Sequence, residues 1–166
     1  MSTTVKTPTK VVVCSNCSTK NRVPAAADGA PRCGNCRSPL PWVVDTSDAD
    51  FTAVADESTI PVLVDVWAPW CGPCRMVSPA LEQLATEFAG RLKLVKVNAD
   101  EAPEVSRRFE VQAIPTLVLM EHGTVVDKQV GAARAPALRS WLTGQLPADE
   151  APATPENDQS TGDGRE

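Results

Sequence analysis

The residues best suited to chemistry are six cysteines, which form three pairs with the spacing Cys-x-x-Cys. One pair, Cys71 and Cys74, follows the apolar run 62–67 and precedes a helix-like stretch, residues 75–88. A helix N-terminus offers unpaired N–H groups and a partial positive charge, and both stabilise a thiolate, the reactive form of cysteine. We therefore predict a redox-active pair. A structural disulfide or half of a metal site is the alternative, which Pro73 and the strand-to-helix context disfavour.

The other two pairs are Cys14 with Cys17 and Cys33 with Cys36, separated by fifteen residues. This is the spacing of a tetrahedral structural zinc site, in which four thiolates leave no open position for catalysis. Residues 11–40 contain few apolar side chains, so the metal would supply the folding free energy of this segment. Two disulfides are one alternative, disfavoured in a reducing compartment, and iron in place of zinc is another.

Strands and helices alternate around the redox pair. We expect strands at 41–44, 62–67, 92–97, 116–120 and 124–130, and helices at 46–57, 75–88, 101–109 and 135–146. The last two strands form a hairpin through residues 121–123. This order predicts an α/β fold with a central sheet covered on both faces. The core-facing side chains expected on the helix after the redox pair are Met76, Val77, Leu81, Leu84 and Phe88.

Composition and charge divide the chain of 166 residues into four parts. We expect a flexible lead at 1–10, a metal-binding module at 11–40, a main domain at 41–146 and a disordered acidic tail at 147–166, with a proline-rich linker at 38–41. The net charge is −5, but residues 1–40 hold six basic residues and one acid, and residues 147–166 hold six acids and one arginine. Because the basic residues are few and no aromatic residue lies among them, nucleic-acid binding is disfavoured.

The sequence contains no signal for export or membrane insertion. No apolar run approaches the ~20 residues of a membrane span. Residues 1–6 lack the apolar core and cleavage site of a signal peptide. We therefore expect a cytoplasmic protein without a membrane partner.

Several short motifs follow one another between residues 42 and 146. They are VDVWAPWCGPC at 64–74, Pro79, KVNAD at 96–100, IPT at 114–116 and VGA at 130–132. With these motifs the chain resembles the thioredoxin family. The two N-terminal cysteine pairs, with NRVP at 21–24 between them, resemble those of the zinc-containing second thioredoxins of bacteria. The resemblance implies the thioredoxin fold, a central mixed β-sheet with helices on both faces, preceded by a small zinc-ribbon-like module.

The resemblance also implies roles for four catalytic residues. Cys71 attacks a disulfide of a partner protein, and Cys74 resolves the mixed disulfide, which leaves Cys71–Cys74 as the redox disulfide. Asp65 takes the proton from Cys74 through water. It is flanked by apolar residues, so we expect it to be buried with a raised pKa, although a solvent-facing edge position is the alternative. Lys96 is the charge partner of Asp65 in the family, and a solvated strand end is an equal alternative for it.

Further residues are implied to contact the substrate. A cis proline at Pro115 beside the dithiol would leave the backbone of Ile114 free to pair with an extended substrate segment. Trp67 is expected to pack behind the site, and His122 to have only a structural role in its turn. The complete substrate-binding set is Trp70, Gly72, Pro73, Ile114, Pro115, Gly131 and Ala132.

These observations predict a thioredoxin-type reductase that reduces disulfides of cytoplasmic proteins. Its implied partners are a thioredoxin reductase, which supplies electrons from NADPH, and disulfide-containing client proteins. We expect a monomer with one structural Zn²⁺ and no bound organic cofactor. A zinc-based redox sensor or redox-regulated holdase is the alternative function. A disulfide oxidase or isomerase is disfavoured by Gly72-Pro73, which is typical of reducing members of the family.

Overall fold

The computed structural model describes residues 9–146. The predicted acidic tail, 147–166, and most of the predicted lead lie outside these residues. Within them, no helix is long and apolar enough to cross a membrane.

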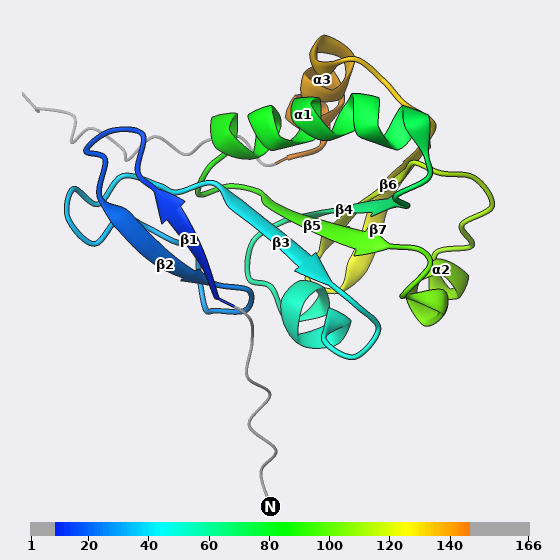
Figure 1. Cartoon of the computed structure of the whole chain (residues 1–166), viewed down its shortest axis with the longest axis horizontal. Coiled ribbons are helices and arrows are strands. Elements are labelled where there is room, and N and C mark those ends of the chain that lie inside the picture. The colour runs from blue at the N-terminus through cyan, green and yellow to red at the C-terminus, as the bar shows by residue number, and fades with distance from the viewer. Residues whose placement is uncertain (1–8, 147–166) are drawn as a thin grey trace, which may run out of the picture.

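A five-stranded mixed sheet forms the centre of the larger part of the molecule (Figure 1). Its strands are β3 (Trp42–Thr46), β4 (Val62–Trp67), β5 (Lys93–Asn98), β6 (Thr116–Glu121) and β7 (Thr124–Val130), in the order β3-β5-β4-β6-β7. The first three are parallel, and β6 and β7 add an antiparallel hairpin. The fold class predicted from the order of elements is confirmed.

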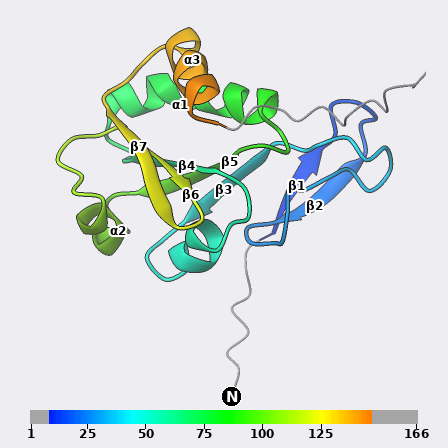
Figure 2. The ribbon, with the colours of Figure 1, turned by 180° about the vertical axis from the view of Figure 1, so that it is seen from behind.

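Helices cover both faces of this sheet (Figures 1 and 2). On one face lie α1 (Gly72–Glu87) and α3 (Ala135–Gln145), and on the other lie α2 (Pro103–Arg108) and the π-helical turn η1 (Thr52–Asp56). The central strands β4 and β6 are almost entirely buried, because both of their faces are covered. Two apolar clusters form the core, one on each face.

Three details of the helices differ from the sequence prediction. Met76 is 80% exposed and does not face the core, because the buried stripe of α1 runs through Val77, Leu81 and Leu84. The helix expected over 46–57 is only the short turn η1, and its N-cap Phe51 makes no side-chain cap. Helix α1 begins at Gly72, three residues earlier than predicted, because Cys71 acts as its N-cap.

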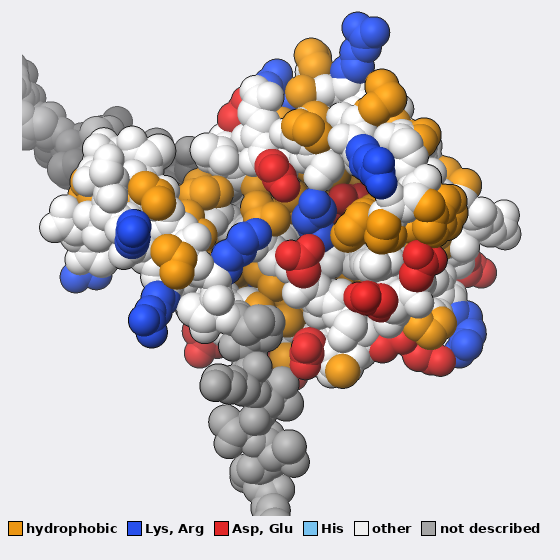
Figure 3. All heavy atoms as spheres, in the orientation of Figure 1, with side chains coloured by type: hydrophobic (Ala, Val, Ile, Leu, Met, Phe, Trp, Pro, Cys, Tyr) orange, Lys and Arg blue, Asp and Glu red, His pale blue; other side chains and the backbone are white. Residues whose placement is uncertain are grey.

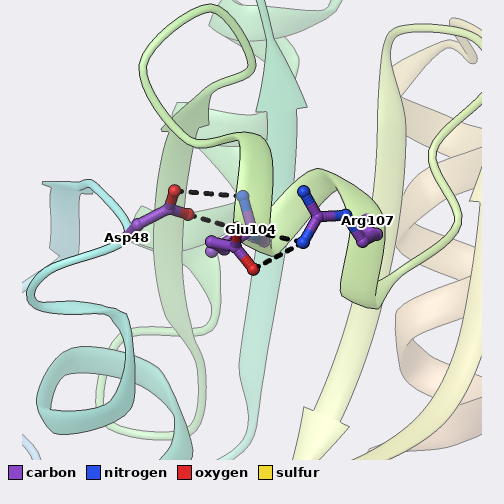
Figure 4. Close-up of polar contacts among 4 residues, drawn as sticks. Asp48, Glu104 and Arg107 are labelled. Atoms are coloured by element: carbon purple, nitrogen blue, oxygen red, sulfur yellow. Dashed lines mark hydrogen bonds and ion pairs between the residues drawn. The ribbon is translucent and has the colours of Figure 1, made fainter.

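Asp48, in the segment predicted to be helical, caps a different helix. Its carboxylate accepts hydrogen bonds from the backbone N–H groups of Glu104, at 3.0 Å, and Val105, at 2.9 Å (Figure 4). The N-cap residue of α2, Ala102, has no side chain that could do this. A carboxylate at a helix N-terminus also interacts favourably with the helix dipole, so Asp48 fixes α2 against the loop that follows β3.

The N-terminal module consists of a two-stranded antiparallel ribbon, β1 (Thr9–Val13) and β2 (Lys20–Pro24), and a loop that leads to β3. Thr9 and Lys10, expected in the lead, belong to β1. The chain at 38–41 is held by contacts: the N–H of Leu40 donates to the Pro31 carbonyl at 3.0 Å, and Leu40 is buried. Buried side chains of the module and of one sheet face form a single apolar cluster.

The folded module is rich in exposed positive charge. Within residues 9–146 none of its five cations forms an ion pair, and all five are exposed: Lys10, Lys20, Arg22, Arg32 and Arg37. In the face shown in Figure 3, basic side chains lie over the module, and acidic side chains lie mainly over the larger part. The basic excess of the module is therefore present on its folded surface.

Candidate active site and metal centre

The redox pair lies where β4 passes into α1. Cys71 and Cys74 are joined by a disulfide, with their Cα atoms 5.3 Å apart. Cys71 caps the helix, and its Sγ accepts the backbone N–H of Cys74 at 3.2 Å. In the reduced protein, the same N–H and the helix dipole would stabilise a thiolate on Cys71. Cys71 is 5% exposed and Cys74 2%, so Cys71 is the more exposed residue of the pair.

Asp65 is a buried carboxyl on β4, only 1% exposed, so its predicted burial is confirmed. Neither carboxyl oxygen has a hydrogen-bond partner within residues 9–146. Burial raises the pKa of Asp65 from 3.8 to about 6, and the positive charge of Lys96 opposes this shift. Asp65 can therefore exchange a proton near neutral pH, as a proton acceptor for a thiol must.

Lys96 lies opposite Asp65 in the pairing of β5 with β4. Its ammonium donates to Ser78 Oγ at 2.9 Å and lies 3.7 Å from a carboxylate oxygen of Glu82. It also lies 5.5 Å from the ring centroid of Trp67, which packs against the apolar cluster that contains both sulfurs. Lys96 is thus a half-buried residue held by α1, not a freely solvated strand end.

The loop before β6 approaches the dithiol from the other side. The peptide bond between Ile114 and Pro115 is cis, and the Ile114 carbonyl oxygen lies 3.8 Å from Cys71 Sγ. The N–H of Gly131 donates to the Pro115 carbonyl at 2.8 Å. Gly131 has φ of +96°, a conformation that favours glycine. Ile114 therefore lies beside the dithiol, Pro115 follows it in the chain, and Gly131 is hydrogen-bonded to Pro115. Ala132 follows Gly131 on the exposed surface.

The remaining predicted substrate residues surround the start of α1. Gly72 and Pro73 are exposed, and Trp70 is 70% exposed beside Cys71. Val130, immediately before Gly131, is 61% exposed. Exposed apolar side chains at Trp70, Pro73 and Val130 therefore lie within two residues of Cys71 or Gly131, and exposed apolar surface of this kind suits the docking of a protein segment better than that of a small polar molecule.

Sequence reasoning missed three residues that hold this site together. Arg75 donates to the carbonyl of Pro69 and so fixes the loop before Cys71. Asp100 accepts the indole N–H of Trp70 at 3.1 Å. Ser78 orients Lys96. Ser78 and Glu82 are four residues apart on α1, so helical periodicity gave a signal that they share a face. Asp100 follows the end of β5, a common position for site residues in α/β sheets.

The four remaining cysteines converge in the module. Their sulfur atoms all lie within 4.8 Å of one another, and none forms a disulfide. Cys14 Sγ lies 3.6 Å from Cys36 Sγ, and Cys17 Sγ lies 3.5 Å from Cys33 Sγ. Tetrahedral Zn²⁺ with Zn–S bonds of about 2.3 Å places its sulfurs about 3.8 Å apart. The donor set and its spacing therefore fit a four-coordinate metal ion such as Zn²⁺.

Both halves of this site have the same backbone geometry. The residue after each pair, Ser18 or Arg37, has a positive φ, 63° and 65° respectively. The first cysteine of each pair then accepts a hydrogen bond at its carbonyl from that residue, Ser18 at 2.9 Å and Arg37 at 3.0 Å. We call each of these turns, 14–19 and 33–38, a knuckle.

Each knuckle ends in a hydroxyl that lies beside its second cysteine. Thr19 Oγ1 lies 3.2 Å from Cys17 Sγ, and Ser38 Oγ lies 3.3 Å from Cys36 Sγ. The Ser38 hydroxyl lowers the pKa of the Cys36 thiol to about 5, and the Thr19 hydroxyl lowers the pKa of the Cys17 thiol to about 7. Thiolates are the metal-binding form of cysteine, so this local chemistry also fits a metal ion.

Comparison with known proteins agrees with the fold. A sequence model of the thioredoxin family, described as "Thioredoxin", matches residues 42–144. Thioredoxin of Haemophilus influenzae is 48% identical over 100 residues, which are 60% of this chain and 94% of that protein. Thioredoxin 1 of Synechococcus elongatus is 46% identical over 100 residues, again 60% of this chain and 94% of the relative.

A third relative matches a longer part of the chain. Thioredoxin C-3 of Corynebacterium nephridii is 37% identical over 139 residues, which are 82% of this chain and 95% of that protein. The match therefore extends beyond residues 42–144. These relatives do not favour the alternative of a zinc-based sensor or holdase, and they support disulfide reductase activity. By its fold, its dithiol and these similarities, the chain belongs to the thioredoxin family.

Proposed function

We propose that this thioredoxin reduces disulfides of cytoplasmic proteins by dithiol exchange at Cys71 and Cys74. One observation carries the proposal: the dithiol sits at the N-terminus of α1, with the Cys74 N–H on Cys71 Sγ and the Ile114–Pro115 segment beside it. Two sulfurs therefore lie at a helix N-terminus that favours a thiolate. Beside them lies a backbone segment with which an extended substrate could pair.

The exchange balances as a two-electron transfer. In the reduced protein, the Cys71 thiolate attacks one sulfur of the substrate disulfide, the substrate S–S bond breaks, and its second sulfur leaves as a thiolate that takes up a proton. Asp65 accepts the thiol proton of Cys74. The Cys74 thiolate then attacks Cys71 Sγ, the mixed disulfide bond breaks, and the Cys71–Cys74 disulfide forms. The remaining substrate sulfur leaves as a thiolate and takes up a proton, which completes the substrate dithiol. A thioredoxin reductase using NADPH would return two electrons.

The pKa of Asp65, about 6, suits this role. At neutral pH the carboxylate form dominates and can accept a proton, and a buried carboxylate holds a proton more readily than an exposed one. Lys96 lies close enough to lower the pKa of Asp65, so we propose that it keeps this carboxyl from remaining protonated.

The four knuckle cysteines would hold a structural Zn²⁺. A bound ion would supply folding free energy to a module that has few apolar residues of its own. Since four sulfurs complete the coordination, we assign no catalytic step to this centre. In a reducing, cytoplasmic compartment these four cysteines would stay reduced and available to the metal ion.

Insulin reduction by the purified protein, with dithiothreitol or a thioredoxin reductase and NADPH as electron source, tests the proposal. We expect turnover by the wild-type chain and none above background by Cys71→Ser. Metal analysis of the same samples should give close to one Zn²⁺ per chain in both. Full activity in the Cys71→Ser variant would refute the assigned mechanism.

A further inference from the structure

A lysine is buried where the module meets the sheet. Lys93, the first residue of β5, is 1% exposed. Its ammonium donates to two backbone carbonyls, that of Ala25 at 2.5 Å and that of Val54 at 2.6 Å, and lies 3.9 Å from the ring centroid of Trp42. None of the ion pairs within residues 9–146 includes Lys93. A lysine is rarely buried to this extent without an anionic partner.

The groups around this ammonium come from three separate segments. Ala25 follows β2 and belongs to the module, Val54 lies in η1, and Trp42 begins β3. Trp42, itself 1% exposed, donates its indole N–H to the carbonyl of Pro24 at 3.0 Å. Two neighbouring side chains of the sheet thus hold the carbonyls of two consecutive module residues, Pro24 and Ala25.

Burying an ammonium is costly unless its donors are satisfied. One of the two carbonyls that satisfy Lys93 comes from the module, that of Ala25. Detaching the module would therefore remove apolar contacts and also break the hydrogen bonds that Lys93 and Trp42 donate to the carbonyls of Ala25 and Pro24. Burial lowers the pKa of Lys93 to about 8, as expected of an ammonium in an environment from which water is excluded.

We propose that Lys93, together with Trp42, couples the module to the five-stranded sheet, so that the two open as one cooperative unit. On this proposal, loss of order in the module also loosens β3 and the start of β5. The single apolar cluster that contains Cys14 and Cys33 of the knuckles and Val44 of β3 is the packing counterpart of this coupling. The coupling rests on geometry alone; only its response to metal rests on the proposed Zn²⁺ site.

Native-state hydrogen exchange on the full chain, at increasing denaturant, tests the coupling. In the wild type we expect the amides of β2 and those of β3 and β5 to exchange through the same opening, with the same denaturant dependence. Lys93→Met keeps an unbranched side chain and removes the ammonium. We expect this variant to exchange the β2 amides on the order of 10- to 100-fold faster, through a separate opening.

Lys128→Met is the matched control. Lys128 also donates to a backbone carbonyl, that of Phe109 at 2.7 Å, but it lies on β7 at the opposite edge of the sheet. Its loss should leave the exchange of the β2 and β3 amides linked. If Lys93→Met does not fold, Trp42→Phe removes only the indole N–H to Pro24 and should give a smaller acceleration of the β2 amides. A wild-type module that already opens alone, or unchanged β2 exchange in a folded Lys93→Met variant, would overturn the proposal.

Repeating the exchange experiment after treatment with a chelator tests the coupling separately from the proposed metal site. Metal removal should accelerate exchange in both β2 and β3 of the wild type, and in β2 alone of the Lys93→Met variant. If the purified chain contains no metal, the Zn²⁺ proposal fails, and the comparison of wild type with Lys93→Met still decides the coupling. Acceleration confined to β2 in the metal-free wild type would count against the coupling.

Discussion

The two kinds of Cys-x-x-Cys in this chain differ in the backbone that follows the second cysteine. After Cys74 the chain continues as α1, so the two sulfurs of the pair face each other and form a disulfide. After Cys17 and Cys36 the chain takes a positive φ and turns back, so each sulfur faces the other pair instead. Equal spacing thus gives a redox pair in one place and half of a four-sulfur site in the other.

This contrast shows where functional information lies in such motifs. The number of residues between the two cysteines determines only how far apart their sulfur atoms can lie. The helix start at Gly72-Pro73 provides the N–H groups that favour a reactive thiolate, whereas the knuckle turns arrange four sulfurs at metal-binding distances. Removing a sulfur of the redox pair should therefore abolish reductase activity and leave the metal content unchanged. Removing a knuckle sulfur should lower the metal content and leave reductase activity nearly unchanged.

The largest expected effect is the loss of reductase activity in Cys71→Ser. A serine cannot attack a disulfide, so insulin reduction should fall to the uncatalysed background. Metal content should stay unchanged, which makes this variant the control for the metal site. Cys74→Ser keeps the attacking sulfur but not the resolving one, so mass spectrometry should detect an accumulated mixed disulfide between Cys71 and the substrate. Absence of that species would contradict the order of attack.

The complementary change is Cys33→Ser, at a knuckle sulfur whose residue is fully buried. With three thiolates left, we expect bound Zn²⁺ to fall to roughly a tenth or less of the wild-type content after dialysis against a weak chelator. Thiol titration should show more rapidly reacting thiols than in the reduced wild type, in which we expect only Cys71 and Cys74 to react readily. Metal content equal to the wild type would argue against the four-sulfur site. The rate of insulin reduction per folded molecule should remain close to that of the wild type.

A smaller effect is expected from Asp65→Asn, as a change in stability with pH. The folded protein raises the pKa of this carboxyl from 3.8 to about 6, so it binds the proton more tightly than the unfolded chain. The free energy of unfolding therefore falls as pH rises from about 4 to about 6 and stays lower above that range. Asparagine avoids this loss, so above pH 6 the variant should be more stable by about 3 kcal/mol.

Denaturant unfolding of the oxidised protein at several pH values measures this difference. It should vanish below about pH 4, where Asp65 is protonated in both states. Asp45→Asn, at an exposed position of β3, is the control and should show no such pH dependence. A difference between wild type and Asp65→Asn that does not change with pH would mean that burial of charge is not its cause.

The smallest effect concerns the turn that distinguishes a knuckle from the redox pair. Arg37 has φ of 65° and an exposed side chain, and a non-glycine residue in this conformation is strained. Arg37→Gly should raise the free energy of unfolding of the metal-bound protein by roughly 0.5–1 kcal/mol. Lys20→Gly, in strand β2, should instead lower it by a similar amount. Thermal unfolding of both variants shows whether each one is more or less stable than the wild type. A destabilised Arg37→Gly variant would show that the arginine side chain stabilises the protein by more than its strained backbone conformation destabilises it.

The sequence predicted the parts of the fold that depend on local patterns. Strand β4 lies at the predicted residues because its run of apolar side chains is buried on both faces, and β7 because a hairpin with His122 and Gly123 at positive φ precedes it. The cysteines and Asp65 were identifiable because few other roles suit those residue types at those positions. The grouping of Ile114, Pro115 and Gly131 near Cys71 came from family resemblance and not from periodicity.

The features that could not be predicted depend on contacts between distant segments. Lys93 in a strand is expected to reach solvent, and its burial depends on carbonyls at Ala25 and Val54. Asp48 was expected within a helix, and it caps α2 instead, through the N–H groups of Glu104 and Val105. Neither partner can be inferred from spacing, because the chain positions are related only by the finished fold.

The contact of Lys93 and Trp42 with the carbonyls of Pro24 and Ala25 limits how freely the N-terminal module can be exchanged between proteins. A graft of residues 9–40 onto a thioredoxin that lacks this lysine and tryptophan would present two carbonyls to a surface with no donors for them. A successful chimera would need both side chains transplanted with the module. In engineering terms, the functional unit to be moved is therefore discontinuous in sequence, and its boundary does not lie at the prolines between the two parts.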